Sequence, residues 1–303
     1  MRLNHMQVAV VAMVGVNIIW GAAFPITKPA LASIPPFTFA LLRFALALLV
    51  LLALAGREAL ALLRGPDRRR LWTMGALGFC AAQLAQTVAL RLSPASDISI
   101  LSAVTPLLIV LLAWPWLGER PRRAQWAGLA GATIGLALVL WPSGADPGGG
   151  ALRLLGDAIF IAGMLGWAAY NVLGRGLMAR VSPLPATAAA ALTGTVALLP
   201  FAIGELALGA PVGISLAGVV GVVYTGLLVT VLGFLTLFWA YRRVDAATIA
   251  ATMYIQPLVG VLLSWALLGE SLGGLFVAGA ALVLAGVWLT SKQPGSLSTD
   301  RHS

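Results

Sequence analysis

The sequence predicts an all-α polytopic membrane protein in which ten transmembrane helices form two inverted five-helix repeats, with both termini in the cytoplasm. Three observations predict this fold: an apolar composition, ten long apolar runs and an internal repeat. Hydrophobic residues make up 60% of the chain and charged residues only 10%, and the mean hydropathy is +0.97. A water-soluble domain carries about 25% charged residues, so this composition fits the bilayer as its solvent.

A helix that crosses the hydrocarbon core needs about 20 predominantly apolar residues. Runs of about that length are separated by Pro-, Gly- and charge-rich stretches, and they are continuous rather than alternating as in a β-barrel. The predicted helices span residues 8–27, 35–55, 71–90, 95–117, 124–141, 154–174, 185–206, 215–240, 246–268 and 272–290. The first run follows Arg2, as in a signal peptide, but its length favours a retained helix.

The chain matches itself at an offset of 151 residues, where residues 89–119 and 240–270 share thirteen identities in thirty-one positions. The informative pairs are Arg91/Arg242, Pro106/Pro257, Trp114/Trp265 and Glu119/Glu270. At an offset of 147 the pairs are Trp20/Trp167 and Lys28/Arg175. This duplication predicts a first repeat over residues 1–145, a second repeat over 146–292 and a short polar cytoplasmic tail over 293–303.

The net charge of +9 is distributed unevenly along the predicted helices. If the N-terminus is cytoplasmic, fifteen Lys and Arg residues face the cytoplasm, three face the other side, and Arg43 lies within a helix. Cytoplasmic loops of membrane proteins carry this excess of positive charge. The basic character therefore indicates orientation and contact with lipid headgroups, and a nucleic acid is not a predicted partner.

Each repeat contains five helices, so the second repeat enters the membrane from the opposite side. Inverted repeats allow a protein to open alternately to either side, with a substrate site near the midplane, as in many secondary transporters. The alternative is that the duplication only records how the protein grew. Transport is favoured because this symmetry supplies alternating access directly.

The sequence also resembles a known family. Trp20-Gly21 followed by Lys28, Trp167-Ala168 in the sixth helix, and Leu-Gly-Glu at the ends of helices four and nine are similar to the EamA-type drug/metabolite transporter superfamily. This resemblance implies export of amino acids, other metabolites or drugs. The size and the Trp-, Met- and Gln-bearing helices further resemble the YddG-type exporters of aromatic amino acids, although a fold does not determine a substrate.

Polar and aromatic side chains within the helices are candidate substrate contacts, because polar groups are costly in hydrocarbon. The predicted substrate-binding residues are Asn17, Trp20, Arg43, Phe79, Gln83, Ser102, Trp167, Tyr170, Thr252 and Gln256. Amides suit a zwitterion but equally suit a bond between helices, and for Ser102 and Thr252 a bond to the preceding helical turn is the favoured interpretation. Trp20 fits either an interfacial anchor or an aromatic wall.

Arg43 is the one basic residue predicted well inside a helix. A charge there is expensive unless it faces a wet cavity or extends to the headgroups. Two interpretations remain open: attraction of a substrate carboxylate, and a conformational ion pair or lipid contact.

Other residues are predicted to control movement rather than to bind. The gating or helix-bending candidates are Pro25, Lys28, Pro106, Arg175 and Pro257. Asp157, near one end of the sixth helix, is the best candidate for proton coupling, but no carboxylate lies at the midplane. A facilitator driven by the substrate gradient therefore remains open.

The absent motifs argue against an enzyme. The chain has no phosphate-binding loop, no hydrolase or metalloprotease motif, and a single cysteine, Cys80. No cofactor and no metal site are predicted. The predicted partners are the lipid bilayer and a small molecule, and the oligomeric state is not predicted.

These observations predict a multi-pass transporter or facilitator of the bacterial inner membrane that exports small amphipathic metabolites by alternating access. Neutral or aromatic amino acids are the first candidates, because an amide- and aromatic-lined path suits a zwitterion with an apolar side chain. A broad hydrophobic drug or metabolite efflux pump is the alternative within this class. A membrane receptor or scaffold is the alternative from a different class.

Overall fold

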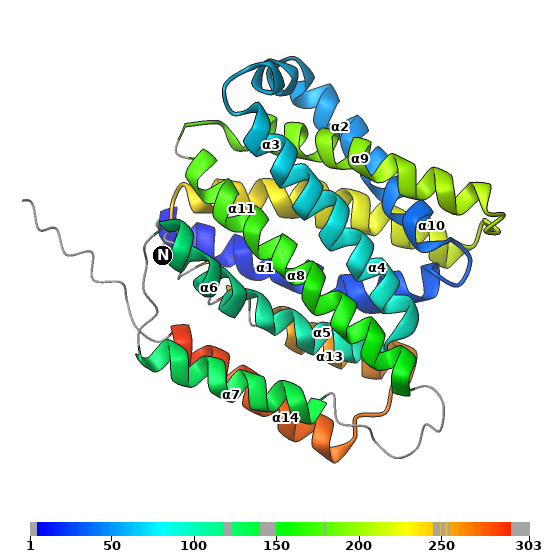
Figure 1. The fold of residues 1–303 in the computed structure, drawn as a ribbon, viewed down its shortest axis with the longest axis vertical. Coiled ribbons are helices and arrows are strands. Elements are labelled where there is room, and N and C mark those ends of the chain that lie inside the picture. The colour runs from blue at the N-terminus through cyan, green and yellow to red at the C-terminus, as the bar shows by residue number, and fades with distance from the viewer. Residues whose placement is uncertain are drawn as a thin grey trace, which may run out of the picture.

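The computed structural model describes residues 5–117, 123–139, 150–178, 180–244, 249, 252–253 and 255–291, and in this part of the chain each of the ten predicted segments contains helix (Figure 1). The first repeat comprises α1 (His5–Ala30), α2 (Pro36–Arg64), α3 (Arg68–Met74), η1 (Gly75–Ala81), α4 (Ala82–Leu92), α5 (Ala95–Leu101), η2 (Ser102–Val104), α6 (Thr105–Leu117) and α7 (Arg123–Val139). The second comprises α8 (Gly150–Met178), α9 (Pro183–Ala207), α10 (Leu216–Val223), η3 (Tyr224–Leu232), α11 (Gly233–Tyr241), α13 (Ile255–Leu268) and α14 (Gly274–Ser291).

The helices have the length and surface of membrane-spanning segments. Six helical segments of 25 to 29 residues are long and apolar enough to cross a bilayer, and the shorter apolar helices occupy the other four predicted positions. Large hydrophobic side chains cover the outside; Leu49 is 71% exposed and Ile203 is 60% exposed. Lipid accounts for such a surface, whereas water would not. The predicted all-α polytopic fold is confirmed.

The packing repeats the symmetry of the sequence. Two contacts join equivalent helices of the two repeats: α2 packs against α9, and α7 packs against α14. The contact of α1 with α13 recurs as that of α8 with α6. In Figure 1 the beginning of α1 and the end of α14 lie at the same side of the bundle, as an even number of crossings requires. Which side faces the cytoplasm stays a prediction from charge.

Several helices are interrupted at informative places. The predicted second span ends at residue 55, where the backbone of α2 leaves the helical conformation at Ala55 (φ −148°, ψ 25°) before helix resumes. The third and eighth spans each contain a π-helical segment, η1 and η3, which begin at Gly75 and Tyr224. Such segments often mark functional parts of a helix, and here they occupy corresponding positions of the two repeats.

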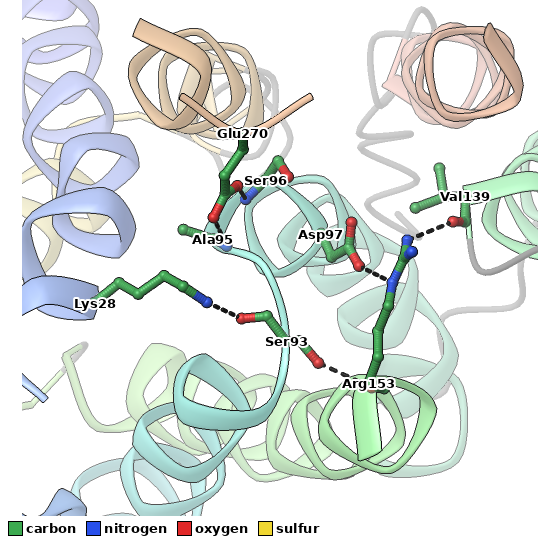
Figure 2. A network of polar contacts seen from close by, with 8 residues as sticks. All are labelled: Lys28, Ser93, Ala95, Ser96, Asp97, Val139, Arg153 and Glu270. Atoms are coloured by element: carbon green, nitrogen blue, oxygen red, sulfur yellow. Dashed lines mark hydrogen bonds and ion pairs between the residues drawn. The ribbon is translucent and has the colours of Figure 1, made fainter. Parts of the chain in front are cut away.

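Two glutamates cap the starts of helices. The Glu205 carboxylate accepts hydrogen bonds from the backbone N–H groups of Phe37 (3.2 Å) and Thr38 (2.7 Å) in the first turn of α2. Glu270 accepts from the N–H groups of Ala95 (2.9 Å) and Ser96 (2.8 Å) at the start of α5 (Figure 2). The first N–H groups of a helix lack helical partners and carry partial positive charge, so both carboxylates act as caps.

Replacing Glu270 by alanine is expected to lower the free energy of unfolding by about 1–2 kcal/mol, because two N–H groups of α5 lose their acceptor. Thermal unfolding of the detergent-solubilised protein measures this change. Glu58→Ala is the control, since Glu58 is exposed near the end of α2. Equal melting temperatures for the two variants would contradict the capping role.

Candidate functional site

A pocket lies between the two repeats and receives side chains from both. Its polar lining consists of Arg43, Gln83, Gln86, Ser102, Thr105 and Gln256. Its apolar lining consists of Trp20, Phe24, Phe160, Met164, Trp167, Val229 and Phe234. The empty space is about 530 Å³ with its open side included, which limits an occupant to a small molecule.

Three aromatic rings form a wall of this pocket. Trp20 of α1, Trp167 of α8 and Phe234 of α11 meet edge to face, with ring centroids 5.2 to 6.2 Å apart. The Trp20 indole N–H donates to the backbone oxygen of Val229 at 3.0 Å. This bond and the close approach of the ring to Gly233 fix Trp20 as part of a rigid wall.

Among the described residues, Arg43 is the only cation that lines the pocket, and its side chain is incompletely bonded. It is 1% exposed, its Nη2 donates to Gln83 Oε1 at 2.8 Å, and its Cζ lies 4.5 Å from the centroid of the Phe44 ring. The Nε and Nη1 atoms have no hydrogen-bond partner in the described part of the chain. At this burial Arg43 does not reach lipid, and Gln83, its hydrogen-bond partner among the described residues, is neutral. Two N–H-bearing atoms of a buried cation are therefore left for a ligand.

Asn17 and Thr252 lie behind the pocket and are occupied by bonds to protein. Asn17 Nδ2 donates to Met13 O (2.7 Å) and to Thr252 Oγ1 (2.9 Å), and the Thr252 hydroxyl donates to Ile249 O (2.7 Å). Gln256 Nε2 donates to Asn17 Oδ1 at 3.4 Å. Gln256 thus links this buried pair to the pocket that it lines.

Phe79 and Tyr170 also lie behind the wall rather than on it. Both are fully buried. The Tyr170 ring stacks on Trp167 at 5.1 Å and 15°, and the Phe79 ring lies 4.9 Å from that of Phe234. These two residues support the aromatic wall from the side opposite the pocket.

The predicted gating residues occupy different surroundings. The Lys28 ammonium donates to the backbone oxygens of Leu90 (3.3 Å) and Ser93 (Figure 2). Arg175 lies exposed in the last turn of α8. Pro25 is inside α1, and Pro257 is buried near the start of α13. Pro106 is the second residue of α6, and its side chain lies outside the described part.

Lys28 belongs to a polar network, shown in Figure 2, at the end of the bundle where α8 begins; we call this the Lys28 end. Arg153 of α8 forms an ion pair with Asp97 of α5 (Nε to Oδ2, 2.6 Å) and donates from Nη2 to Val139 O at 3.2 Å. The Ser93 hydroxyl donates to Arg153 O at 2.9 Å. Together with the Glu270 cap, these bonds tie helices of both repeats together at this end.

Some lining residues escaped the search for polar or aromatic markers, notably Phe160, Met164, Val229 and Phe234. The repeat offset could have found one of them. Counting 151 residues from Gln83 gives Phe234, and counting 151 residues back from Gln256 gives Thr105. Trp20 and Trp167 are related in the same way at the offset of 147 residues. All six line the pocket, so three repeat-related pairs build much of its surface.

An apolar helical bundle of two repeats, with a small-molecule pocket between them, defines the class of multi-pass membrane transport proteins. Residues 7–141 and 154–292 each match the model of the EamA-like transporter family. The chain therefore belongs to the EamA-like transporter family and is a multi-pass protein of the bacterial inner membrane.

Named relatives agree in length with this chain. A probable terminal-alkyne amino-acid exporter of Streptantibioticus cattleyicolor is 32% identical, over 94% of either chain. A probable amino-acid metabolite efflux pump of Salmonella typhimurium is 27% identical, over 90% of this chain and 91% of its own. The uncharacterized inner membrane transporter YedA of Escherichia coli is 27% identical over 97% and 96%. A crystal structure that is 21% identical over 93% of this chain superposes with a TM-score of 0.66, which supports the fold alone.

Proposed function

We propose that this protein exports amino acids with apolar or aromatic side chains across the inner membrane and binds them in the pocket between its repeats. Arg43 carries the proposal. A buried guanidinium with two N–H-bearing atoms that no described residue pairs is costly in an empty protein, and a carboxylate is its natural partner.

The rest of the pocket suits the remaining parts of such a molecule. The amide oxygens of Gln86 and Gln256 can accept from an ammonium group, and the face of Trp20 attracts a cation. Phe24, Phe160 and Met164 offer an apolar surface to a side chain. The names of two relatives, an amino-acid exporter and an amino-acid metabolite efflux pump, agree with this chemistry.

Alternating access is the mechanism that the repeats support. Repeat-related residues meet in the pocket, so exchanging conformations between the repeats would expose the same side chains to the opposite side. The charge distribution orients the Lys28 end away from the cytoplasm. Opening of that end after loading from the cytoplasm would then release the substrate outward.

Counterflow into proteoliposomes tests this function. Vesicles loaded with unlabelled L-phenylalanine or L-leucine are expected to accumulate the same radiolabelled amino acid, whereas protein-free vesicles are not. Excess phenylalanine amide, which lacks the carboxylate, is expected to inhibit at least about 10-fold more weakly than phenylalanine, because it cannot occupy the Arg43 donors.

Two results would contradict the proposal. Transport of the lipophilic cation tetraphenylphosphonium without counterflow of any amino acid would favour a broad drug efflux pump. Absence of transport for every probe, with an intact fold, would favour a receptor or scaffold.

A further inference from the structure

Asp157 is a carboxylate that the polar network leaves unused. It is fully buried on α8, and neither of its oxygens has a hydrogen-bond partner among the described residues. The tight packing of α8 on the end of α4 explains this burial: a Cβ added at neighbouring Gly156 would lie 2.4 Å from Ser93 Oγ. The Ser93 hydroxyl is close enough to act on the Asp157 carboxylate, but in the hydrogen-bond geometry it donates its one proton to Arg153 O. A buried carboxylate without a donor is stable only as the neutral acid or beside a cation.

Asp157 lies next to the pocket on the side of the Lys28 end. Phe24 of α1 and Phe160 of α8 both line the pocket and meet edge to face at 6.1 Å. Lys28 is one turn beyond Phe24, and Asp157 is one turn beyond Phe160. The two ionisable residues therefore lie together, just outside the aromatic pair that borders the pocket.

The charged surroundings of Asp157 come from several elements. Lys28 of α1, Arg153 of α8 and Asp97 of α5 interact with it electrostatically, and Glu270 interacts with Lys28 and Asp97. Both cations are already engaged: Lys28 by two backbone oxygens, Arg153 by Asp97. Arg91, in the last turn of α4, is exposed. While this end is closed, no cation in the described part of the chain is bonded to Asp157.

The repeat does not supply the same arrangement at the other end of the protein. Lys28 corresponds to Arg175 at an offset of 147, but Asp157 corresponds to Val10 and Arg153 to Met6. At the offset of 151, Asp97 corresponds to Thr248. Asp97 and Asp157 thus have no ionisable counterparts at the repeat-related positions, whereas Glu270 corresponds to Glu119.

We propose that Asp157 is a proton-binding site linked to closure of the Lys28 end. Closing takes up one proton from the water on that side, which converts the carboxylate into the neutral acid. Opening hydrates the side chain, frees Lys28 to face it, and returns the proton to the same water. Because the closed state binds more protons than the open state, its share falls as the pH rises. Any effect of this protonation on export depends on the proposed function, whereas the protonation of Asp157 does not.

Infrared difference spectroscopy of the whole protein in lipid reads the proton directly. The acid-minus-alkaline spectrum is expected to contain the carbonyl band of a protonated buried carboxylic acid. Asp157→Asn and Asp157→Leu are expected to lose this band. Glu205→Gln is expected to retain it, because the Glu205 oxygens are bonded to the start of α2.

Spin labels at two exposed positions read closure. Leu152 lies at the start of α8, and Ile214 follows Gly213, whose N–H donates to Ser33 O (2.7 Å) just beyond the end of α1. After Cys80→Ala, acidification is expected to shift the distance distribution toward its shorter component in the otherwise unchanged protein and in Glu205→Gln. In Asp157→Asn the distribution is expected to be independent of pH.

Persistence of the carbonyl band in both Asp157 variants would overturn the proposal. A distance distribution that does not change with pH would overturn it as well. Neither measurement uses an amino acid, so failure of the proposed export would leave both results unaffected.

Discussion

Replacing Arg43 by leucine is expected to abolish amino-acid binding and counterflow without lowering the thermal stability of the empty protein. Hydrogen bonds to charged groups are each worth about 1.5–3 kcal/mol, so losing two of them weakens binding by at least about 100-fold. The stability of the empty protein is expected to hold, because within the described part of the chain the buried guanidinium has one neutral acceptor and two unpaired nitrogen atoms. An apolar residue of similar volume commonly replaces such a charge at no cost.

Binding is measured by quenching of tryptophan fluorescence, since Trp20 and Trp167 line the pocket, and stability by thermal unfolding. Gln86→Leu is the control: it removes a neutral amide from the same pocket and is expected to weaken binding by at most about 10-fold. Arg43→Lys keeps the charge without the planar fork and is expected to bind between these two variants. A strongly destabilised Arg43→Leu protein that still binds phenylalanine would assign Arg43 to the scaffold instead.

Replacing Gly194 by alanine is expected to destabilise the protein by about 1–3 kcal/mol and to reduce transport. Gly194 lies where α9 meets the π-helical segment η1, and an added Cβ would stand 2.2 Å from Phe79 Cβ and 2.7 Å from Gly75 O. The backbone of Gly75 cannot move away from the added Cβ as the end of a flexible side chain could. Displacement of Phe79 would also shift Phe234, because their ring centroids are 4.9 Å apart and Phe234 lines the pocket.

Gly204→Ala on the same helix is the matched control, since no described atom beyond the adjacent residues and the backbone of its own helix lies within 4 Å of its added Cβ. This variant is expected to melt at the same temperature as the unchanged protein or slightly above it, because alanine favours helix over glycine. Thermal unfolding and counterflow of both variants measure the difference. Similar melting temperatures for the two alanine variants would refute the close α9–η1 packing.

Much of the fold was predictable because hydrocarbon allows few solutions. A segment without water must satisfy its backbone groups internally, so each long apolar run becomes a helix. The boundaries were less predictable: α2 resumes after the break at Ala55 and reaches Arg64, because a helix can continue beyond the hydrocarbon once its side chains are polar. The π-helical segments η1 and η3 left no marker in the apolar pattern.

The candidate site divides in the same way. The search for polar and aromatic side chains within the predicted helices identified Trp20, Gln83, Trp167 and Gln256, all of which line the pocket. The same search also identified Asn17 and Thr252, which are hydrogen-bonded to each other behind the pocket. Spacing along one helix identifies which residues share a face but not which helix that face meets. The residue type alone therefore cannot distinguish a side chain that lines the pocket from one that bonds to a neighbouring helix.

The sequence by itself determined that this chain is a helical membrane protein of two repeats with more positive charge on one side, because composition, run length and self-similarity are properties of the chain. Only the tertiary structure decided that Arg43 keeps two nitrogen atoms without a partner among the described residues, and that Asp157 is likewise buried without one at the Lys28 end. The physical reason is that the cost of a buried charge depends on which groups from distant helices reach it, and packing alone brings those groups together.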